Sequence, residues 1–349
     1  MTEPPFTRIL IVGLGLMGGS TALAIRERWP GVTIVGVDRA DVIAEAQAAG
    51  AIDTGATDIA SALRDAALKD RGSQDAGPQK AGSQDGAHRD STILVLLAAP
   101  VLQNIACLAE IATAKTPLLV SDLSSTKQAI VQAARALPDH ITFLGGHPMA
   151  GAARGGFAHA RADLFRGRPW ILTPDTSDAG GRSVSLPGGG PLPGAALSRL
   201  QGFVSALGAE PVVMDAAEHD RVMAYVSHLP QIVASGLMRT IGPRVGADGL
   251  AVSGQGLADS TRLASSPAGV WTEICQTNAA PLGAALDALI ADLQTVRQQL
   301  AVPEKMATWL ESGARWRSEL PNANGSANGA TGANSATSVA SNAQVKVHE

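Results

Sequence analysis

His147 carries the clearest indication of chemistry in the sequence, because a histidine can accept or release a proton near neutral pH. It stands in the run GGHPMAG, directly after the strand-like segment Ile141–Leu144. The glycines and the proline around it indicate a tight, shaped loop at the end of that strand. The alternative is a core histidine that is hydrogen-bonded to a loop. Since a nucleotide-binding pattern opens the chain, the sequence favours proton transfer coupled to a redox step.

A second polar cluster follows another predicted strand, Leu118–Ser121. The run Asp122–Lys127, DLSSTK, lies at the carboxyl end of that strand, where ligands bind in a doubly wound sheet. A hydroxyl of Ser124, Ser125 or Thr126 could cap the next helix, contact a substrate, or do both.

The second half of the chain adds histidines and an arginine. His219 and His228 are nine residues apart, which puts them on roughly opposite faces of one straight helix. No cysteine or third histidine joins them, so the pattern argues against a metal site. Arg262 could form a surface ion pair or bind a substrate carboxylate through two nitrogens. The residues alone do not decide between these two roles.

Gly13, Gly15 and Gly18 form the pattern GxGxxG between a predicted strand and a predicted helix. The first glycine permits a tight turn, the second lets a pyrophosphate approach the backbone, and the third lets helix and strand pack closely. Asp38 ends the second strand, 20 residues after Gly18, where a carboxylate could bind the ribose hydroxyls of NAD. The adjacent Arg39 could stack on adenine or accept a phosphate, so NADP stays open. Asp38 could instead be a helix cap or a turn residue.

Four more residues complete the predicted cofactor site. Leu16 and Met17 lie inside the glycine pattern, and Ala99 and Pro100 follow the apolar strand Ile93–Ala98. Small residues at such a strand end would line the ribose of the nicotinamide half. Plain termination of the strand explains Ala99 and Pro100 almost as well.

Composition excludes several other classes of protein. The chain has 349 residues, a formal net charge of −4 and no basic stripe, which argues against a nucleic-acid surface. Cys107 and Cys275 are far apart in the sequence and are typical of reduced, packed thiols. The uncharged run Ile9–Ile25 resembles an export signal, but its flank MTEPPFTR lacks the cationic region that such a signal needs. We therefore expect a cytoplasmic protein with no membrane segment.

The elements that must position these residues alternate between short apolar strands and helices up to about residue 215. Strands are predicted at Arg8–Val12, Val32–Val37, Ile93–Ala98, Leu118–Ser121, Ile141–Leu144, Trp170–Thr173 and Pro211–Met214. Helices are predicted up to Arg28 after the glycines, and at 41–66, Leu102–Ala112, Lys127–Leu137 and Ala195–Leu207. This alternation is typical of an α/β fold with a doubly wound parallel sheet.

After residue 215 the strand signals stop, and three long helices are predicted, at Ala217–Thr240, Asp259–Asn278 and Ala280–Ala301. We expect three regions: a nucleotide-binding domain at 1–215, a helical domain at 216–320 and a disordered tail at 321–349. Two polar, low-complexity stretches of the first domain are predicted to be disordered insertions, at about 69–90 and 177–194.

Taken together, these runs resemble the prephenate/arogenate (cyclohexadienyl) dehydrogenase family of tyrosine biosynthesis. The matching motifs occur in family order over roughly residues 8–275, as GLGLMGGS, VDR, DLSSTK, FLGGHPMAG, LFRGRPWILTP, AEHDRVMAYVSHLP and DSTRLASSPAGVW. GGHPMAG together with SHLP is highly specific to the family, whereas GxGxxG is not.

The resemblance implies a Rossmann-type domain, an all-helical dimerisation domain and oxidative decarboxylation of prephenate, arogenate or both with NAD(P). The products would be 4-hydroxyphenylpyruvate and tyrosine. His147 would accept the proton of the ring hydroxyl while hydride leaves the same carbon, and Ser125 would orient both groups. Arg262 would bind a substrate carboxylate, and His219 would line the pocket. The implied partners are the small-molecule substrate and a second copy of the chain in a homodimer.

Gln231 follows SHLP at a position where some family members carry another histidine. A neutral amide there could relax the preference for the keto-acid side chain of prephenate, so we hypothesise dual or arogenate-leaning use with Gln231 in the substrate site. One rival is a β-hydroxyacid dehydrogenase, which the near absence of lysine from the second half disfavours. The other is a non-catalytic sensor that binds NAD. No fused chorismate mutase and no regulatory domain are expected.

Overall fold

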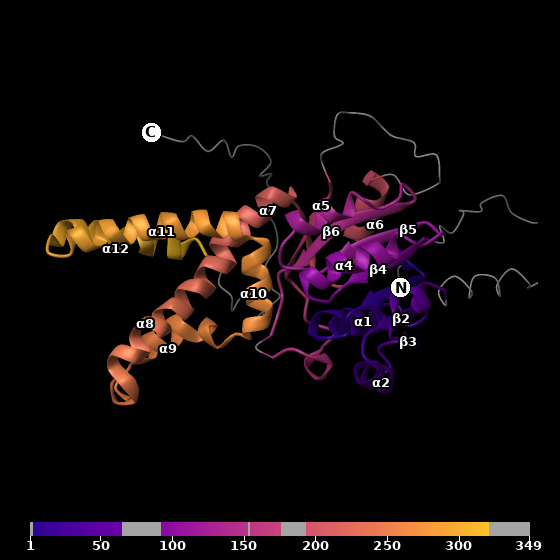
Figure 1. Cartoon of the computed structure of the whole chain (residues 1–349), viewed down its shortest axis with the longest axis horizontal. Helices are drawn as coiled ribbons and strands as arrows, with labels where there is room; N and C mark the ends of the chain where they lie inside the picture. Colours follow the sequence, from indigo (N-terminus) through magenta and orange to yellow (C-terminus); the bar gives the residue numbers. More distant parts are fainter. Residues whose placement is uncertain (1–2, 65–91, 153, 176–192, 321–349) are drawn as a thin grey trace, which may run out of the picture. The chain divides into compact units, whose positions relative to one another are not determined.

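One eight-stranded sheet organises the first part of the chain in the computed structural model, which describes residues 3–64, 92–152, 154–175 and 193–320. The strand order is β3-β2-β1-β4-β5-β6-β7-β8, and every neighbouring pair is parallel except β6 and β7. Figure 1 labels the strands β2 to β6 of this sheet. The strands are β1 Arg8–Val12, β2 Thr33–Val37, β3 Thr54–Ala56, β4 Ile93–Leu97, β5 Leu118–Asp122, β6 Ile141–Pro148, β7 Pro169–Thr173 and β8 Glu210–Val213.

Strand residues alternate between two hydrophobic cores, one on each face of the sheet. In β1, Ile9 and Ile11 belong to the core that includes α1 and α6, whereas Leu10 and Val12 belong to the core that includes α4 and α5. The covering helices are α1 Leu16–Arg28, α4 Val101–Ile111, α5 Gln128–Ala134 and α6 Pro193–Ala206. Because both faces are covered, the central strands are continuous apolar runs, and the predicted doubly wound fold is confirmed.

The chain changes direction across the sheet between β1 and β4. From β1 it builds outward through β2 to β3, and from β4 it builds outward on the other side. Ligands bind outside the carboxyl ends of strands at such a switch point. Gly13 follows β1 and Ala98 follows β4, so two segments of the predicted cofactor site meet at this crevice.

β6 includes His147, so the prediction of a loop at this position is wrong. The end of β6 pairs antiparallel with β7. The glycines here permit close packing rather than a turn. A Cβ on Gly145 would lie 2.3 Å from Thr173 Oγ1, and one on Gly146 would lie 2.6 Å from the Asp122 backbone oxygen. His147 therefore takes its orientation from the sheet.

The single helix predicted over residues 41–66 is also wrong. α2 (Ala40–Ala48) stops just before Gly50, whose φ of 67° lies in the left-handed region that ends many helices. The chain then forms β3 at the edge of the sheet, against β2. The alanine-rich composition predicts a helix, but Gly50 ends it. The residues of β3 then pair with β2 through their backbones. Residues 65 and 66 lie outside the described residues.

All elements described after β8 are helical, as predicted. They are α7 Ala216–Met223, the π-helical turn η2 Ala224–His228, α8 Leu229–Ala251, α9 Gln255–Thr261, the 3-10 turn η3 Arg262–Ser265, α10 Ala268–Thr277, α11 Ala279–Gln299 and α12 Pro303–Ser318.

Two of the three long helices predicted in this region are interrupted. η2 replaces an α-helical turn in the first of them. The second breaks at Ser266, which has extended backbone because the residue before a proline avoids the helical conformation. α12 is not among the predicted helices; it begins at Pro303, a residue type favoured in the first turn of a helix.

Contacts divide the chain into two compact units, Met1–Ala288 and Leu289–Glu349. In the second unit, Trp309 Nε1 donates to the Asp292 carboxylate at 3.1 and 3.2 Å. The domain limits at residues 215 and 320 remain a prediction.

The predicted insertion at 69–90 and the predicted tail lie outside the described residues. The insertion at 177–194 does so too, apart from its last two residues, which begin α6. No helix in the described ranges is long and apolar enough to cross a membrane.

Candidate active site

A cavity of about 580 Å³ lies at the crevice between β1 and β4. Gly13, Gly15, Asp38, Ala99 and Pro100 line it, as predicted for a cofactor site. A Cβ on Gly13 would lie 2.7 Å from the Ala99 nitrogen, whereas a Cβ on Gly15 would meet only open space. No side chain caps α1 at this end. Its free N–H groups and its dipole therefore suit a pyrophosphate.

The other residues of the glycine pattern do not line this cavity. A Cβ on Gly18 would lie 1.8 Å from the Gly13 carbonyl oxygen, so the third glycine serves helix–strand packing. Leu16 and Met17, predicted as cofactor residues, line a second cavity instead. They stand in the first turn of α1, which thus separates the two cavities.

Asp38 is held by the backbone at the end of β2. Its Oδ2 accepts from Leu14 N–H at 2.6 Å, and its Oδ1 accepts from Arg39 N–H at 2.7 Å. The Arg39 guanidinium lines the cavity but is bound by Asp41, at 3.1 Å from Nε and 2.8 Å from Nη2. Asp41 raises the pKa of Arg39, which stays charged. Beside Asp38, the crevice is thus lined by an arginine that Asp41 already engages.

The second cavity, of about 770 Å³, brings the predicted catalytic residues together. Ser125 and His147 line it from the sheet side, and Arg262 lines it from η3. Leu16 and Met17 form the wall toward the cofactor crevice. Leu16 and Arg262 are more than two hundred positions apart in the sequence, and the fold places both around the same cavity.

This second cavity is positively charged and partly apolar. Arg161, Arg168 and Arg262 line it, and no described acidic residue does. Trp271 and Ile274 of α10 add an apolar wall. Such a combination suits a small ring compound that carries negative charge.

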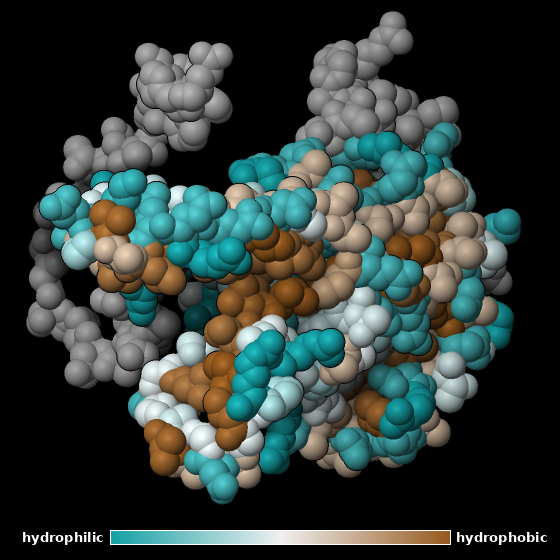
Figure 2. All heavy atoms as spheres, turned by 60° about the vertical axis from the view of Figure 1, so that its left-hand side comes forward, coloured by the Kyte–Doolittle hydropathy of each residue, from teal (hydrophilic) through white to brown (hydrophobic). Residues whose placement is uncertain are grey.

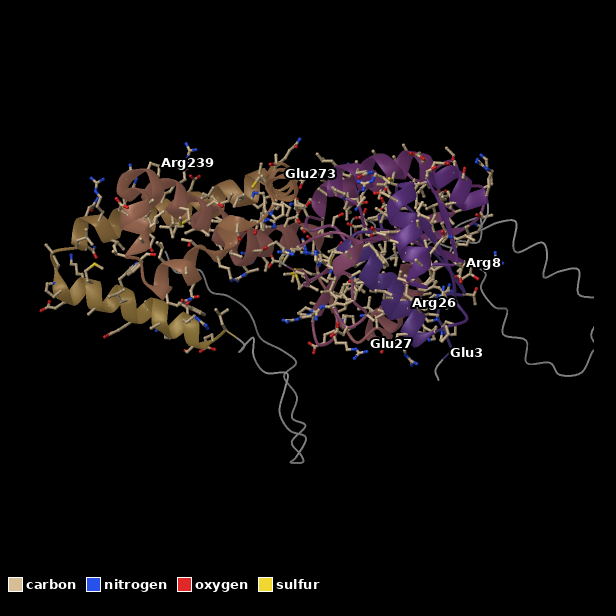
Figure 3. All side chains as sticks on the ribbon, turned by 90° about the horizontal axis from the view of Figure 1, so that it is seen from below. Glu3, Arg8, Arg26, Glu27, Arg239 and Glu273 are labelled. Carbon is tan, nitrogen blue, oxygen red and sulfur yellow. The ribbon has the colours of Figure 1, made fainter. Side chains whose placement is uncertain are left out.

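α10 also reaches the cofactor side. Glu273, labelled in Figure 3, lies between Trp271 and Ile274 in the sequence, and its Oε2 accepts from Leu102 N–H at 3.3 Å. Leu102 stands in the first turn of α4, directly after Pro100 and Val101. The carboxylate therefore caps α4 and links the walls of the two cavities.

His147 is buried to 8% exposure and belongs to a chain of buried side chains. Its Nδ1 lies 2.9 Å from His219 Nε2, and His219 Nδ1 lies 2.8 Å from Asp220 Oδ1. The two imidazole rings meet edge to face, with centroids 5.1 Å apart. The prediction that His219 lines the pocket is wrong, because its side chain is completely buried behind His147.

His219 and His228 also do not fall on opposite faces of a helix. Both are buried, and His228 is the last residue of the π-helical turn η2. Such a turn holds more residues than an α-helical one, so the residues that follow are rotated relative to a straight helix. Asn278 Nδ2 donates to His228 Nδ1 at 2.9 Å. No group of three or more possible metal ligands occurs among the described residues.

A buried ion pair fixes the residue before His147. Lys127 Nζ contacts the Asp122 carboxylate, and both side chains have no exposure. Lys127 Nζ donates to the Gly146 carbonyl at 2.7 Å, and Asp122 Oδ1 accepts from Gly146 N–H at 3.0 Å. Both backbone groups of Gly146 are thus held by the DLSSTK segment, which orients His147 beside it.

Burial keeps the histidines of this cluster neutral. Desolvation lowers the pKa of His147 well below its ordinary value, and the neighbouring His219, Lys127 and His228 lower it further. Desolvation also lowers the pKa of His219, although Asp220 opposes that shift. It lowers the pKa of His228 to about 4. At neutral pH His147 is an uncharged base.

The hydroxyl groups of DLSSTK do not cap α5. Ser124 Oγ accepts from Asn104 Nδ2 at 2.9 Å, and Thr126 Oγ1 lies 2.9 Å from Thr277 Oγ1. The free N–H groups at this helix end bind Asp220 instead. Ser125 is left facing the cavity.

Gln231, predicted in the substrate site, does not line the cavity. Its side chain is buried, and its Nε2 donates to the Leu263 carbonyl at 2.8 Å. It therefore holds the η3 turn, which carries Arg262 to the cavity wall. Substrate contact at this position stays a prediction, since the bond to Leu263 uses Nε2 and Oε1 has no hydrogen-bond partner in the structure.

Sequence reasoning missed Asp220 and the two arginines Arg161 and Arg168. Asp220 had a signal, because it stands beside a histidine in AEHDRVM, at a position that α7 buries. Arg168 stands in the family motif LFRGRPWILTP, whereas Arg161 had no signal, since exposed arginines are common on any surface.

The fold and its two cavities define a dinucleotide-dependent oxidoreductase. Two family models match the chain: the nucleotide-binding domain of prephenate dehydrogenase at residues 72–182, and its dimerization domain at residues 215–311. Prephenate dehydrogenase of Bacillus subtilis is 31% identical over 90% of this chain and 76% of that protein. Cyclohexadienyl dehydrogenase of Zymomonas mobilis is 29% identical over 85% of this chain and 89% of that protein. The chain belongs to the prephenate dehydrogenase family, and it is an NAD(P)-dependent enzyme of that family.

Solved structures agree on the fold. Prephenate dehydrogenase from A. aeolicus, in complex with hydroxyphenyl propionate and NAD+, matches with a TM-score of 0.72 and 24% identity. The match covers 91% of this chain and 99% of that one. Arogenate dehydrogenase from Synechocystis matches with a TM-score of 0.66 and 22% identity, over 90% of this chain and all of that one.

Proposed function

We propose that this protein oxidatively decarboxylates prephenate, arogenate or both, with NAD as the hydride acceptor. The observation that carries the proposal is His147, a neutral base that lines an arginine-rich cavity on the other side of α1 from a dinucleotide crevice. The names of the relatives support the same chemistry.

His147 accepts the proton of the ring hydroxyl in this proposal. The O–H bond breaks as hydride leaves the same carbon for bound NAD, which supplies the oxidising capacity. The ring carboxylate then departs as CO2, and its bonding electrons complete the aromatic ring. The phenolate oxygen that results takes the proton back from His147. Ser125 lines the cavity beside His147 and orients the hydroxyl. A base that is already deprotonated at neutral pH suits such a step.

Arg262 binds a carboxylate of the substrate. It forms no ion pair with another described residue, so its guanidinium is available to a ligand. Both candidate substrates carry a ring carboxylate, and prephenate carries a second negative charge on its side chain. Arg168 and Arg161 supply further positive charge to the same cavity, which supports binding of either compound.

NAD is the preferred cofactor in this proposal. Asp38 stands where the ribose hydroxyls would bind and would repel a 2′-phosphate. Arg39, which could accept such a phosphate, is engaged by Asp41.

The protein acts as a cytoplasmic homodimer. The match to a dimerization domain supports this assembly. Apolar side chains also remain exposed on the helices after residue 216, some of which come forward in Figure 2. Among the exposed residues are Leu237, Val245, Val252 and Val270.

The test is the formation of NADH, or of NADPH, from prephenate and from arogenate in four separate assays. Turnover of either substrate, faster with NAD, is expected. The ratio of kcat/KM for the two substrates then gives the substrate preference. Absence of turnover in all four assays by a protein that still binds NADH would overturn the proposal.

A further inference from the structure

The contacts around Asp220 determine which ring nitrogen of His219 carries a hydrogen. Asp220 Oδ1 accepts from Lys127 N–H at 2.7 Å, and Oδ2 accepts from Gln128 N–H at 2.8 Å. A backbone N–H can only donate, so both carboxylate oxygens are acceptors. His219 Nδ1, 2.8 Å from Oδ1, must therefore be the donor in that pair.

The same logic continues to His147. A neutral imidazole has one N–H and one lone pair. With its hydrogen on Nδ1, His219 presents a lone pair on Nε2, which lies 2.9 Å from His147 Nδ1. His147 must therefore donate from Nδ1, and its own lone pair is on Nε2. Since His147 lines the second cavity, this unprotonated nitrogen is the one left for a substrate.

We propose that His219 and Asp220 are positioning residues for His147, which hold its hydrogen on Nδ1 and take up the positive charge formed when Nε2 accepts a proton. The proposal rests on the function proposed above. The substrate O–H bond breaks and its proton bonds to His147 Nε2. The Nδ1 hydrogen of His147 then moves to His219 Nε2. The positive charge comes to lie beside the Asp220 carboxylate, and the proton returns through His147 to the phenolate oxygen that loss of CO2 leaves on the ring.

The other titratable groups near the two rings are Lys127 and His228 and, around the cavity that His147 lines, Arg161, Arg168 and Arg262. Lys127, from the β5–α5 connection, would repel a cation on either ring, but its ammonium is paired with Asp122. His228, from η2, is neutral and binds Asn278. Asp220 is therefore the carboxylate in direct contact with the histidine pair.

Two substitutions of His219 separate the two roles in the proposal, which are to hold the hydrogen on His147 Nδ1 and to take up the positive charge. His219→Gln can still accept from His147 Nδ1 but cannot take up a proton, whereas His219→Phe can do neither. We expect kcat to fall about 100-fold or more in H219F, within the range for proton-transfer catalysis, and about tenfold in H219Q. In both variants the acid limb of kcat/KM should move to lower pH, because Asp220 no longer stabilises the protonated pair.

The matched control is His228→Gln, which changes an equally buried histidine of the same cluster that does not bond to His147. Its acid limb should not move to lower pH, because His228 itself lowers the pKa of His147. Thermal melting and NADH binding establish that each variant is folded. An acid limb at the wild-type pH in H219Q, with kcat reduced equally in H219Q and H219F, would reduce His219 to a packing role and overturn the proposal.

A second readout does not need turnover. Nitrogen NMR of ¹⁵N-histidine-labelled protein reports which ring nitrogen of His147 carries the hydrogen. The wild type should show the hydrogen on Nδ1, and H219F should show a mixture of the two tautomers. Hydrogen on Nε2 in the wild type would refute the inference even if prephenate is turned over. If NMR places the hydrogen on Nδ1 but neither substrate is turned over, the proposed function is refuted and the inference about the tautomer stands.

Discussion

The cofactor crevice and the second cavity differ in the groups that form them. The crevice is mainly backbone: glycines without side chains, the uncapped start of α1, and strand ends. The second cavity owes its chemistry to side chains, and the groups behind His147 are buried and charged or polar. Asp122, Lys127, His219 and Asp220 all have no exposure.

This difference determines what each region tolerates. The crevice fails when a side chain is added, because its purpose is to let a phosphate approach the backbone. The region behind His147 fails when a side chain is removed, because each buried charge depends on a partner. The four changes below all test the side-chain half of this comparison.

The largest effect is expected from His147→Asn. The variant keeps a polar group in β6 but loses the base, so kcat should fall by roughly 10²–10⁴-fold, the usual contribution of a positioned base. The affinity for NADH, measured by fluorescence titration, should stay at the wild-type value, because His147 does not line the cofactor crevice. Near-normal turnover in H147N would assign the base to another residue.

Lys127→Met should cause the largest loss of stability. It leaves the Asp122 carboxylate buried without its counter-charge, which typically costs about 3–5 kcal/mol. Urea denaturation measures the loss. The double variant K127M/D122N should recover part of it, because the neutral amide needs no counter-charge. If K127M alone is as stable as the wild type, the ion pair does not hold this part of the fold.

The cofactor crevice could be predicted from the sequence because the residues that form it must meet strict local requirements. The same requirements mean that it tolerates little change. Its requirements are local: a glycine at a fixed spacing, and an acid at the end of the next strand. Gly13, Gly15 and Asp38 therefore stand where the pattern puts them. The buried strands were equally predictable, because a parallel sheet covered on both faces leaves a continuous apolar run.

The assembly behind His147 could not be predicted in this way. That His147 lies within a strand depends on pairing with β7, more than twenty residues later. That His219 is buried behind it depends on how α7 packs against the DLSSTK segment. Neither is a property of local spacing. The motif resemblance named His147, Ser125 and Arg262, but it also placed His219 in the lining of the pocket, whereas the fold buries His219 behind His147.

Arg262→Gln tests the wall of the second cavity. Removing a charge-assisted contact to a carboxylate should raise KM about 10–100-fold, with a smaller change in kcat. Steady-state kinetics with each substrate measures this. Arg244→Gln is the matched control, because Arg244 is exposed on α8 and does not line the cavity. A fall in kcat at unchanged KM would place Arg262 in the chemical step rather than in binding.

The smallest effect is a pH dependence of stability that comes from His228. Burial lowers the pKa of this side chain to about 4 in the folded protein, whereas in the unfolded chain it titrates near 6.5. Between these values only the unfolded state binds the proton, so the free energy of unfolding falls as the pH drops through this range, by up to about 1.4 kcal/mol per pH unit for one such group. Above pH 6.5 both states are neutral and His228 contributes no slope.

His228→Gln isolates this contribution, because it removes the titrating group and leaves His147 and His219 in place. Urea denaturation at pH 7 and at pH 5 should show a smaller loss of stability for H228Q than for the wild type. Equal losses would mean that His228 binds its proton as readily in the folded protein as in the unfolded chain. The cluster behind His147 would then be open to water, and its difference from the cofactor crevice would be one of composition rather than of burial.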